Sequence, residues 1–303
     1  MVTDLVGTVL ERDGSVYRIA TADGEVRAVL RGKVKRDTPR VVVGDRVHLD
    51  SEAGSGETYG ISSVDERRSL LERRVPEGRG SRPVAANIDQ VFVVTATKDP
   101  APIPQLIDRL LVVAESNSLS AAVIMNKIDL DRGEALTARM RGAGYEVLPA
   151  SVKTGEGIDE LRARLRGHIV VVTGPSGAGK SSLLNVIQPG LKLRIGAISA
   201  KVRRGTNTTV SAVMIPIEGG GFLVDTPGFS EVGLWGIDPT QLDSCFPEMR
   251  PLIGECKYGD CRHMSEPGCA MKRAVEEGRM SPDRLESYRV LLTELEELPK
   301  DWE

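Results

Sequence analysis

Up to about residue 82, apolar and polar positions alternate in short stretches, and this period of two predicts strands with one buried face. Asp-Gly pairs between the stretches supply the positive φ that tight hairpin turns need. Several short strands joined by hairpins favour a small barrel. We expect an OB-type barrel, because that fold combines this size with a nucleic-acid-binding face; an SH3-like barrel is the alternative, which composition does not separate from it. The expected strands are Gly7–Leu10, Ser15–Ile19, Glu25–Leu30 and a pair within Val41–Leu49, with Asp13-Gly14 and Asp23-Gly24 as turns.

The pattern changes after Arg73–Pro83, a stretch rich in Arg, Gly and Pro that we interpret as a linker. Apolar runs of the buried type then alternate with segments of helical period, which is typical of a parallel, doubly wound α/β domain. After about Pro239 the chain becomes cysteine-containing, and a last helix is expected over Pro282–Leu298. The expected strands of the α/β part are Ile88–Ala96, Ala121–Met125, Tyr145–Leu148, Ile169–Thr173 and Phe222–Val224, and its helices Ile107–Glu115, Leu136–Gly142, Ile158–Arg166 and Lys180–Ile187.

These patterns divide the chain into three expected domains, a barrel over residues 1–82, an α/β domain over 83–238 and a cysteine-containing helical domain over 239–303. A chain of 303 residues, 40% of them hydrophobic, can build cores for two or three domains. It has no apolar run of about 18 residues and no apolar signal core at its start. We therefore expect a cytoplasmic protein without a membrane partner.

The net charge of −3 hides three basic segments. Arg27–Arg46 holds seven basic residues against two acidic ones, and Lys192–Arg204 holds five basic residues and no acidic one. Arg67–Arg82 holds six arginines against two glutamates. Such segments favour contact with phosphate backbones, but from charge alone an ordinary solvated surface is an equally good interpretation.

The clearest chemical motif is the glycine-rich loop Gly174-Pro175-Ser176-Gly177-Ala178-Gly179-Lys180-Ser181, followed by Ser182. It lies between an expected buried strand and an expected helix, the context of a phosphate-binding loop. The glycines let backbone amides turn toward phosphates, Lys180 reaches the β- and γ-phosphates, and the Ser181 hydroxyl can bind Mg²⁺. The helix start adds a favourable partial positive charge.

A second motif, Asn126-Lys127-Ile128-Asp129, follows a strand at the end where α/β sheets bind ligands. The Asp129 carboxylate can accept hydrogen bonds from N1–H and the 2-amino group of guanine, and Lys127 can lie along the base. Ser151-Val152-Lys153 follows the next strand and supplies a second turn beside the base. Together with the phosphate loop, this motif predicts GTP or GDP as the nucleotide. Most GTPases have the phosphate loop first, so the reversed order indicates a circularly permuted GTPase domain.

A third motif, Asp225-Thr226-Pro227-Gly228, follows another apolar strand and matches an Asp-x-x-Gly element. It would place Asp225 near Mg²⁺ and the Gly228 amide near the γ-phosphate. The polar segment Arg203–Thr209 has the composition of a switch loop, in which a threonine hydroxyl binds Mg²⁺ while the γ-phosphate is present. We expect Thr209 in this role, with Thr208 as the nearest alternative; a plain polar loop is the other interpretation.

In this order the motifs resemble those of the bacterial ribosome small-subunit-dependent GTPase A family, along essentially the whole chain. The resemblance implies an N-terminal OB barrel, a permuted P-loop GTPase domain and a C-terminal zinc-binding helical domain. It also implies a factor that binds the small ribosomal subunit and its 16S rRNA late in maturation and hydrolyses GTP there. We hypothesise that GTP orders the outer domains for RNA binding and that hydrolysis releases them. Nothing in the sequence requires more than a monomer.

The zinc domain of that family has a counterpart in Cys256, Cys261, His263 and Cys269, spaced Cys-x₄-Cys-x-His-x₅-Cys. Three thiolates and one imidazole complete a tetrahedral Zn²⁺ site, so the expected ion, one per chain, is structural. The alternative is a set of reduced thiols with a chance histidine. Cys245 lies outside this spacing, and we expect it to pack as a small hydrophobic residue.

The catalytic features of the family are matched only in part. Phe229 stands where many GTPases have a water-orienting glutamine, and Asn207 stands where the family often has a switch-loop histidine. Asparagine can position water but cannot act as a base, which favours slow intrinsic turnover stimulated by the ribosome. Gly177 stands where K⁺-dependent GTPases have an asparagine, so no K⁺ site is expected.

Two other functions fit part of this pattern. The loop sequence also resembles that of guanylate kinases, but those enzymes place the loop near the N-terminus and lack an Asn-Lys-x-Asp partner. The other alternative is an RNA-binding scaffold with a vestigial nucleotide site. The joint presence of Lys180, Ser181, Asp225 and Asp129 argues against it.

Overall fold

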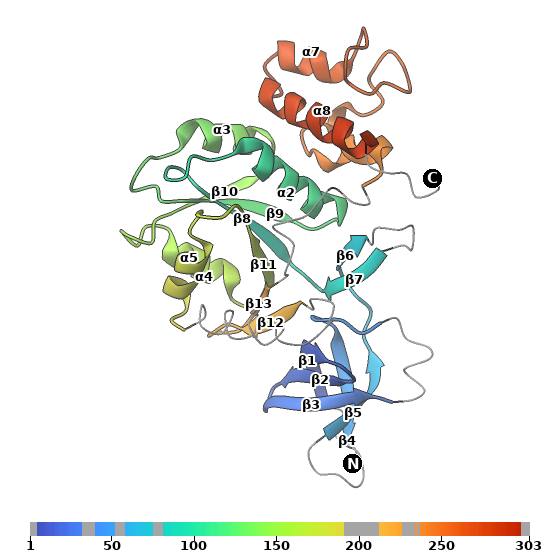
Figure 1. Cartoon of the computed structure of the whole chain (residues 1–303), viewed down its shortest axis with the longest axis vertical. Coiled ribbons are helices and arrows are strands. Elements are labelled where there is room, and N and C mark those ends of the chain that lie inside the picture. The colour runs from blue at the N-terminus through green and yellow to red at the C-terminus, as the bar shows by residue number, and fades with distance from the viewer. Residues whose placement is uncertain are drawn as a thin grey trace.

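The structure is a computed structural model that describes residues 5–31, 40–51, 58–74, 81–190, 212–225, 234 and 237–297. Figure 1 shows a small barrel at one end of the molecule, an α/β region in the middle and a group of helices at the other end. Among the helices of the described ranges, none is both long and apolar enough to cross a membrane.

Five strands close the barrel in the order β1-β2-β3-β5-β4. β3 and β5 are parallel, and every other pair of neighbours is antiparallel. β1 has a bulge between Val9 and Glu11 and pairs with both β2 and β4, which closes the barrel. A closed barrel with this strand order and one parallel pair, β3 with β5, is the OB type, so this expectation is confirmed over the SH3-like alternative. The strands are β1 (Leu5–Asp13), β2 (Val16–Thr21), β3 (Gly24–Leu30), β4 (Arg46–Ser51) and β5 (Thr58–Val64).

The strand pair expected within Val41–Leu49 is wrong, because only β4 forms there. The residues before it make a buried turn around Asp45, whose carboxylate accepts a hydrogen bond from the Val42 N–H at 2.8 Å. The Arg67 guanidinium pairs with the same carboxylate at 2.7 Å. Apolar side chains in this segment are buried because the turn is held inside the molecule, so their burial does not indicate a strand.

The stretch expected to be a linker contains part of a strand pair. β6 (Leu70–Arg74) and β7 (Ser81–Ala86) pair antiparallel, with a register shift between Leu71 and Glu72. Leu71 and Ala85 are buried and belong to the main core. The pair therefore connects the barrel to the α/β region by packing as well as by the chain, and Figure 1 shows it beside both.

The α/β region is built on a six-stranded sheet of order β10-β9-β8-β11-β13-β12. Five strands are parallel; the edge strand β12, which was not among the expected strands, is antiparallel to β13. Helices α2 and α3 pack on one face, and α4 and α5 pack on the other, as expected of a doubly wound sheet. The elements are β8 (Gln90–Ala96), α2 (Pro104–Ser116), β9 (Ala121–Asn126), α3 (Glu134–Gly142), β10 (Glu146–Ala150), α4 (Ile158–Leu165), β11 (Ile169–Thr173), α5 (Lys180–Ile187), β12 (Val213–Pro216) and β13 (Phe222–Asp225).

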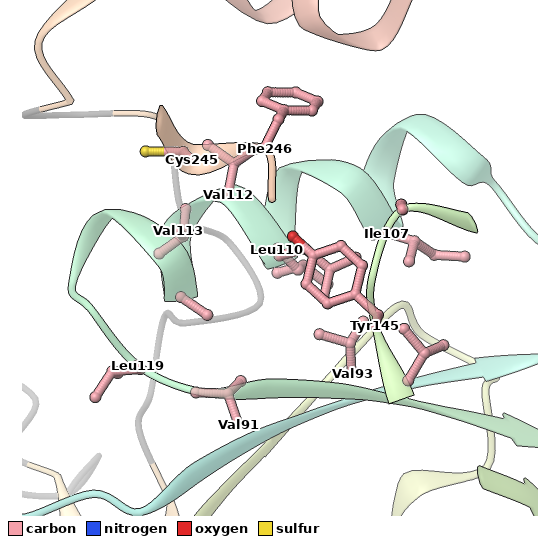
Figure 2. Close-up of a cluster of buried hydrophobic side chains, with 14 of the residues drawn as sticks. Val91, Val93, Ile107, Leu110, Val112, Val113, Leu119, Tyr145, Cys245 and Phe246 are labelled. Atoms are coloured by element: carbon pink, nitrogen blue, oxygen red, sulfur yellow. The ribbon is translucent and has the colours of Figure 1, made fainter. Parts of the chain in front are cut away.

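The C-terminal region packs on the outer side of α2. Figure 2 shows Cys245 and Phe246 beside Val112 of that helix, while Val91 and Val93 lie on the sheet side. Cys245 is buried in this cluster, as expected, and burial raises the pKa of its thiol to about 11. The region contains the short 3₁₀ helices η2 (Pro239–Cys245) and η3 (Arg250–Leu252) and the α-helices α7 (Ala270–Glu276) and α8 (Pro282–Glu297).

A buried set of charges joins the C-terminal region to the α/β region. Asp108 of α2 is fully buried and accepts hydrogen bonds from Arg284 of α8, at 2.7 Å, and from Arg139 of α3. Arg284 also donates two bonds to Glu248, at 2.6 and 3.1 Å, and lies over the Phe246 ring. Two arginines and two carboxylates therefore balance their charges, with Asp108 and Arg284 buried and Arg139 and Glu248 nearly so.

At the other end, the barrel packs against the edge strand β12. Leu10 of β1, Val43 of the buried turn and Met214 of β12 are buried in one core cluster. Gly44 lies in the same contact with a φ of +90°, and a Cβ there would lie 2.1 Å from the Ala86 carbonyl oxygen and 3.2 Å from the Met214 methyl carbon. The positive φ and the close approach of this turn to the end of β7 therefore require glycine at this position.

Candidate nucleotide and metal sites

The phosphate-binding loop expected at Gly174–Ser181 lies at the carboxyl end of β11, in the middle of the sheet. Gly174, Gly177 and Gly179 all have positive φ, at +139°, +79° and +90°. A Cβ on Gly174 would lie 2.0 Å from the Val94 carbonyl oxygen of the neighbouring strand. Only glycine allows the loop to turn this close to β8, and the turn leads directly into α5, which begins at Lys180.

Lys180 points back into its own loop. Its Nζ donates hydrogen bonds to the carbonyl oxygens of Gly174, at 2.6 Å, and Pro175, at 2.9 Å. Burial lowers the pKa of this ammonium. Ser181 and Ser182, in the first turn of α5, are exposed on the same side of the sheet. A hydroxyl oxygen here suits Mg²⁺, which binds oxygen ligands and keeps several waters.

The guanine motif expected at Asn126–Asp129 lies at the end of β9, and the structure brings it to the phosphate loop. Asn126 is buried, and its Nδ2 donates to the Ala178 carbonyl oxygen at 2.9 Å. A Cβ on Gly179 would lie 2.4 Å from that same Nδ2. The two motifs are therefore in direct contact, although the sequence separates them by two strands and two helices.

Asp129 is exposed, with one oxygen already bound. The Ser151 hydroxyl donates to its Oδ1 at 2.6 Å, and Ser151 is itself buried in the turn that follows β10. Lys153 of this turn is exposed and Val152 is half-buried. The second expected turn thus lies beside the first, with the free side of the Asp129 carboxylate open to a ligand.

The third expected motif is only partly within the described residues. β13 pairs in parallel with β11, and Val224 lies opposite Val171, so the strand delivers Asp225 to the same edge of the sheet as the phosphate loop. The side chain of Asp225 and the residues Asn207, Thr208, Thr209 and Gly228 lie outside the described residues, as does the basic segment Lys192–Arg204.

The zinc ligands expected in the C-terminal region form one cluster. The donor atoms of Cys256, Cys261, His263 and Cys269 all lie within 4.8 Å of one another. His263 Nδ1 is 3.6, 3.5 and 3.4 Å from the three sulfurs, in chain order. Zn–S bonds of about 2.3 Å and Zn–N bonds of about 2.0–2.1 Å at tetrahedral angles give N···S edges of about 3.5 Å. The four residues therefore fit a zinc ion closely, with no position left for a substrate.

Neighbouring groups fix the orientation of these ligands. The Ala270 N–H donates to Cys256 Sγ at 3.2 Å, and His263 Nε2 faces Asp243 Oδ2 at 3.6 Å. Arg289 of α8 donates to the carbonyl oxygens of His263, at 3.0 Å, and Met264, at 2.8 Å. Carboxylate and carbonyl partners of this kind are what orient ligands at structural metal sites.

Sequence reasoning missed the segment that follows β8. Thr97 donates from Oγ1 to the Lys127 carbonyl oxygen at 3.0 Å, and the Asp99 carbonyl oxygen accepts a hydrogen bond from Lys127 Nζ. Pro100 lies against Gly177 of the phosphate loop, where a Cβ would lie 3.1 Å from its Cδ. No local motif marks these residues, because their partners are far away in the sequence.

The sequence model of one family, described as RsgA GTPase, matches residues 64–235, more than half of the chain. The chain belongs to the RsgA GTPase family. The small ribosomal subunit biogenesis GTPase RsgA of Gemmatimonas aurantiaca is 47% identical over 303 residues, which cover 97% of this chain and 99% of the relative. The protein of the same name from Moorella thermoacetica is 40% identical over 291 residues, which cover 95% and 97%.

Solved structures agree with this assignment. YjeQ from Thermotoga maritima matches with a TM-score of 0.79 at 33% identity, over 97% of this chain and 99% of that one. YloQ, described as a circularly permuted GTPase, matches with a TM-score of 0.77 at 25% identity, over 98% and 97%. The predicted family and permuted architecture are confirmed, and as an RsgA GTPase the protein is a GTP-hydrolysing enzyme. The guanylate kinase and scaffold alternatives are not supported.

Proposed function

We propose that this GTPase acts late in the maturation of the small ribosomal subunit, binds the subunit and its 16S rRNA as a cytoplasmic monomer, and leaves after hydrolysis. The two relatives are named as small ribosomal subunit biogenesis GTPases, and they match the chain over nearly its whole length. The observation that carries the proposal in this chain is the hydrogen bond from Asn126 to Ala178, which joins the guanine motif to the phosphate loop in one site.

In this proposal the nucleotide lies across the carboxyl ends of β9, β10 and β11. The base is held by Asn126, Lys127 and Asp129, with the turn Ser151–Lys153 beside it, and the phosphates by the loop from Gly174 to Ser182. Lys180 exchanges two neutral carbonyl oxygens for phosphate oxygens when GTP binds. Hydrogen bonds between charged partners are the stronger ones, so this exchange favours binding.

Hydrolysis needs neutralised phosphate charge and a positioned water. Ser181 and Thr209, with Asp225 nearby, would hold Mg²⁺, which would neutralise phosphate charge, and the Gly228 amide and Lys180 would donate hydrogen bonds to the γ-phosphate. Asn207 orients the water through its side-chain amide. A neutral amide does not take up a proton near pH 7, so we expect slow hydrolysis by the free protein and faster hydrolysis on the subunit.

Contact with RNA rests on the outer domains, which we assign to residues 1–82 and 239–303, around a GTPase domain at 83–238. Arg27 and Arg40 are exposed on the barrel side, whereas Arg31 and Arg46 pair with Asp50 and Asp65. Part of the basic segment is therefore neutralised within the protein, and Arg27 and Arg40, which are exposed and form no ion pair with another described residue, are the ones to contact phosphates. The zinc ion, one per chain, holds the C-terminal ligand loop in shape.

The test is GTP hydrolysis by the purified protein with and without isolated small subunits, at several salt concentrations, with Lys180→Ala as the inactive control. We expect strong stimulation by subunits, absent in Lys180→Ala and weakened by salt, because contacts with phosphates release counterions. If subunits leave the turnover unchanged, the protein is still a GTPase, but the proposed action on the ribosomal subunit is wrong. Stimulation by large subunits alone would contradict the proposal in the same way.

A further inference from the structure

We propose that Thr97 is a positioning residue for guanine recognition, because it holds Lys127 in the backbone conformation that the base-binding motif needs. Thr97 follows the last residue of β8 and is no part of the three nucleotide motifs. The inference rests on the proposed role of Asn126–Asp129 in binding guanine. In this inference Thr97 contributes to the preference for guanine by positioning Lys127, and Thr97 itself does not contact the nucleotide.

Lys127 has an unusual backbone. Its φ is +63°, in the left-handed region that residues with a Cβ rarely adopt. A residue persists in this region only when its surroundings hold it there. One such contact is local, since the Lys127 N–H donates to the Asn126 side-chain oxygen at 2.9 Å.

Thr97 supplies two further contacts, one to each peptide group beside Lys127. The Thr97 N–H donates to the Asn126 carbonyl oxygen at 2.9 Å, and the Thr97 Oγ1 donates to the Lys127 carbonyl oxygen at 3.0 Å. These carbonyls belong to the peptide planes before and after the Lys127 Cα. Fixing both planes fixes φ and ψ of the residue between them.

The hydroxyl of Thr97 is itself held in place by packing. Thr97 is 8% exposed, and its methyl carbon lies against Gly133, where a Cβ would be only 2.8 Å away. With the methyl group on Gly133, the hydroxyl faces Lys127. A valine would keep the packing and lose the donor, and a serine would keep the donor and lose the packing, so the two substitutions separate these roles.

The same segment also holds the far end of the Lys127 side chain. Lys127 Nζ donates to the Asp99 carbonyl oxygen, which extends the chain along the side of the site where the base is expected. Pro100 then contacts the phosphate loop at Gly177. The segment from Thr97 to Pro100 therefore aligns the guanine motif with the phosphate loop.

Loss of the Thr97 hydroxyl removes one of two donors to the Lys127 carbonyl oxygen and leaves only the Leu130 N–H, at 2.9 Å, so the left-handed conformation becomes less populated. Guanine then binds only the fraction of molecules that retain it, and the apparent Kd rises by the inverse of that fraction. Adenine nucleotides bind mainly through their phosphates and gain little from Lys127 and Asp129. The discrimination between guanine and adenine should therefore fall.

The experiment measures Kd for GDP and for ADP, with Mg²⁺, in the full-length protein and in Thr97→Val, Thr97→Ser and Thr95→Val. Thr95 is a matched control: it is buried two residues earlier, and its hydroxyl donates only to the Ala96 carbonyl oxygen, at 3.3 Å. We expect Thr97→Val to weaken GDP binding about fivefold, the order of one lost hydrogen bond, and ADP binding by less than about twofold. Thr97→Ser and Thr95→Val should keep the GDP-to-ADP ratio of the parent.

An unchanged GDP affinity in Thr97→Val would overturn the proposal. So would an equal loss for both nucleotides, which indicates general loss of structure, or a Thr97→Ser protein that behaves like Thr97→Val. A parent protein that binds GDP and ADP equally would instead overturn the guanine assignment of Asn126–Asp129, and this result is distinguishable because it appears before any variant is compared.

Discussion

A single carboxylate, Asp129, is expected to decide which base the protein accepts. The Ser151 hydroxyl binds one of its oxygens at 2.6 Å, which orients the group and leaves its remaining acceptor positions for a ligand. A carboxylate only accepts hydrogen bonds, so it suits the N1–H and 2-amino donors of guanine. It repels any base that presents a carbonyl in place of the amino group.

The first prediction follows from this pairing. Asp129→Asn should weaken GDP binding about 100-fold, because one donor now meets another, and should strengthen xanthosine diphosphate, whose C2 carbonyl accepts from the new amide. Competition with a fluorescent GDP analogue measures both affinities. Asp131→Asn is the control, since Asp131 is a nearby exposed carboxylate that accepts only from the Gly133 N–H. A variant that still prefers GDP would contradict the role of Asp129.

At the residue scale, sequence reasoning found the side chains that share a local motif. Short sequence patterns contain Asn126, Asp129, Ser151 and Lys180, and the chemistry of these patterns can be predicted without knowledge of the fold. Thr97 could not be found this way, since a lone threonine after a strand is ordinary and its partner Lys127 comes from another strand. The contact exists only because neighbouring parallel strands bring their carboxyl ends together.

Among the structural elements, the loop between η3 and α7, which carries the four candidate zinc ligands, is the one we expect to depend most on a metal. Its residues 253–262 form no strand or α-helix, and most of them are exposed. The loop closes on itself through the four candidate zinc ligands, and Arg289, Glu296 and Asp243 hold it from outside. A segment with so little apolar burial gains its folded form from metal binding.

We therefore predict that chelation, or Cys261→Ser, removes zinc from about one per chain to near zero and unfolds this loop locally. Metal analysis gives the stoichiometry, and hydrogen exchange should show lost protection over 253–269 with protection retained in β8, β9 and β11. Cys245→Ser is the control, because Cys245 lies outside the cluster and should keep the ion. Full protection of the loop after chelation would argue against a structural zinc.

At the element scale, the sequence predicted the strands and helices whose positions are set by hydrophobic periodicity. The parallel strands and the helices that cover them are long apolar runs or clear helical stripes, and they lie close to their expected positions. β12 was missed because four residues at a sheet edge carry too short a pattern. The pair β6–β7 was missed because its buried residues, Leu71, Ala85 and Ala86, flank a stretch rich in Arg, Gly and Pro that has the composition of a linker. The residues Val41–Val43, before the turn at Asp45, were taken for a strand because tertiary contacts bury their apolar side chains.

For the whole molecule, the two outer regions are attached to different parts of the GTPase sheet. The barrel packs on β12, next to the strand that ends at Asp225, whereas the C-terminal region is fixed to α2 and α3 through Asp108. Our hypothesis from the sequence gave both regions the same response to GTP. The contacts favour the barrel as the region that responds, through β12, to movement of β13 and the Asp225 motif that follows it.

The buried set of charges around Asp108, which joins the C-terminal region to the α/β region, leads to a prediction about stability. Asp108→Asn should lower the free energy of unfolding by about 3 kcal/mol, because it leaves the buried Arg284 and Arg139 short of a carboxylate. Glu294→Gln breaks the ion pair of Glu294 with Arg109 between the same two helices, α2 and α8, but that pair is partly exposed and should contribute less than about 1 kcal/mol. Urea unfolding measures both. Equal decreases in the free energy of unfolding for the two variants would mean that burial does not determine how strongly these ion pairs stabilise the protein.

The packing of the barrel on β12 also determines when the barrel can bury its outer apolar residues during protein synthesis. The barrel leaves the ribosomal tunnel before β12, and it can close on itself because all five of its strands lie before β6. Leu10 and Val43, which it buries against Met214, stay in contact with water until β12 has been translated. A chaperone that protects this nascent chain should therefore hold that patch, and substitutions there should act on the yield of newly made protein more than on the finished barrel.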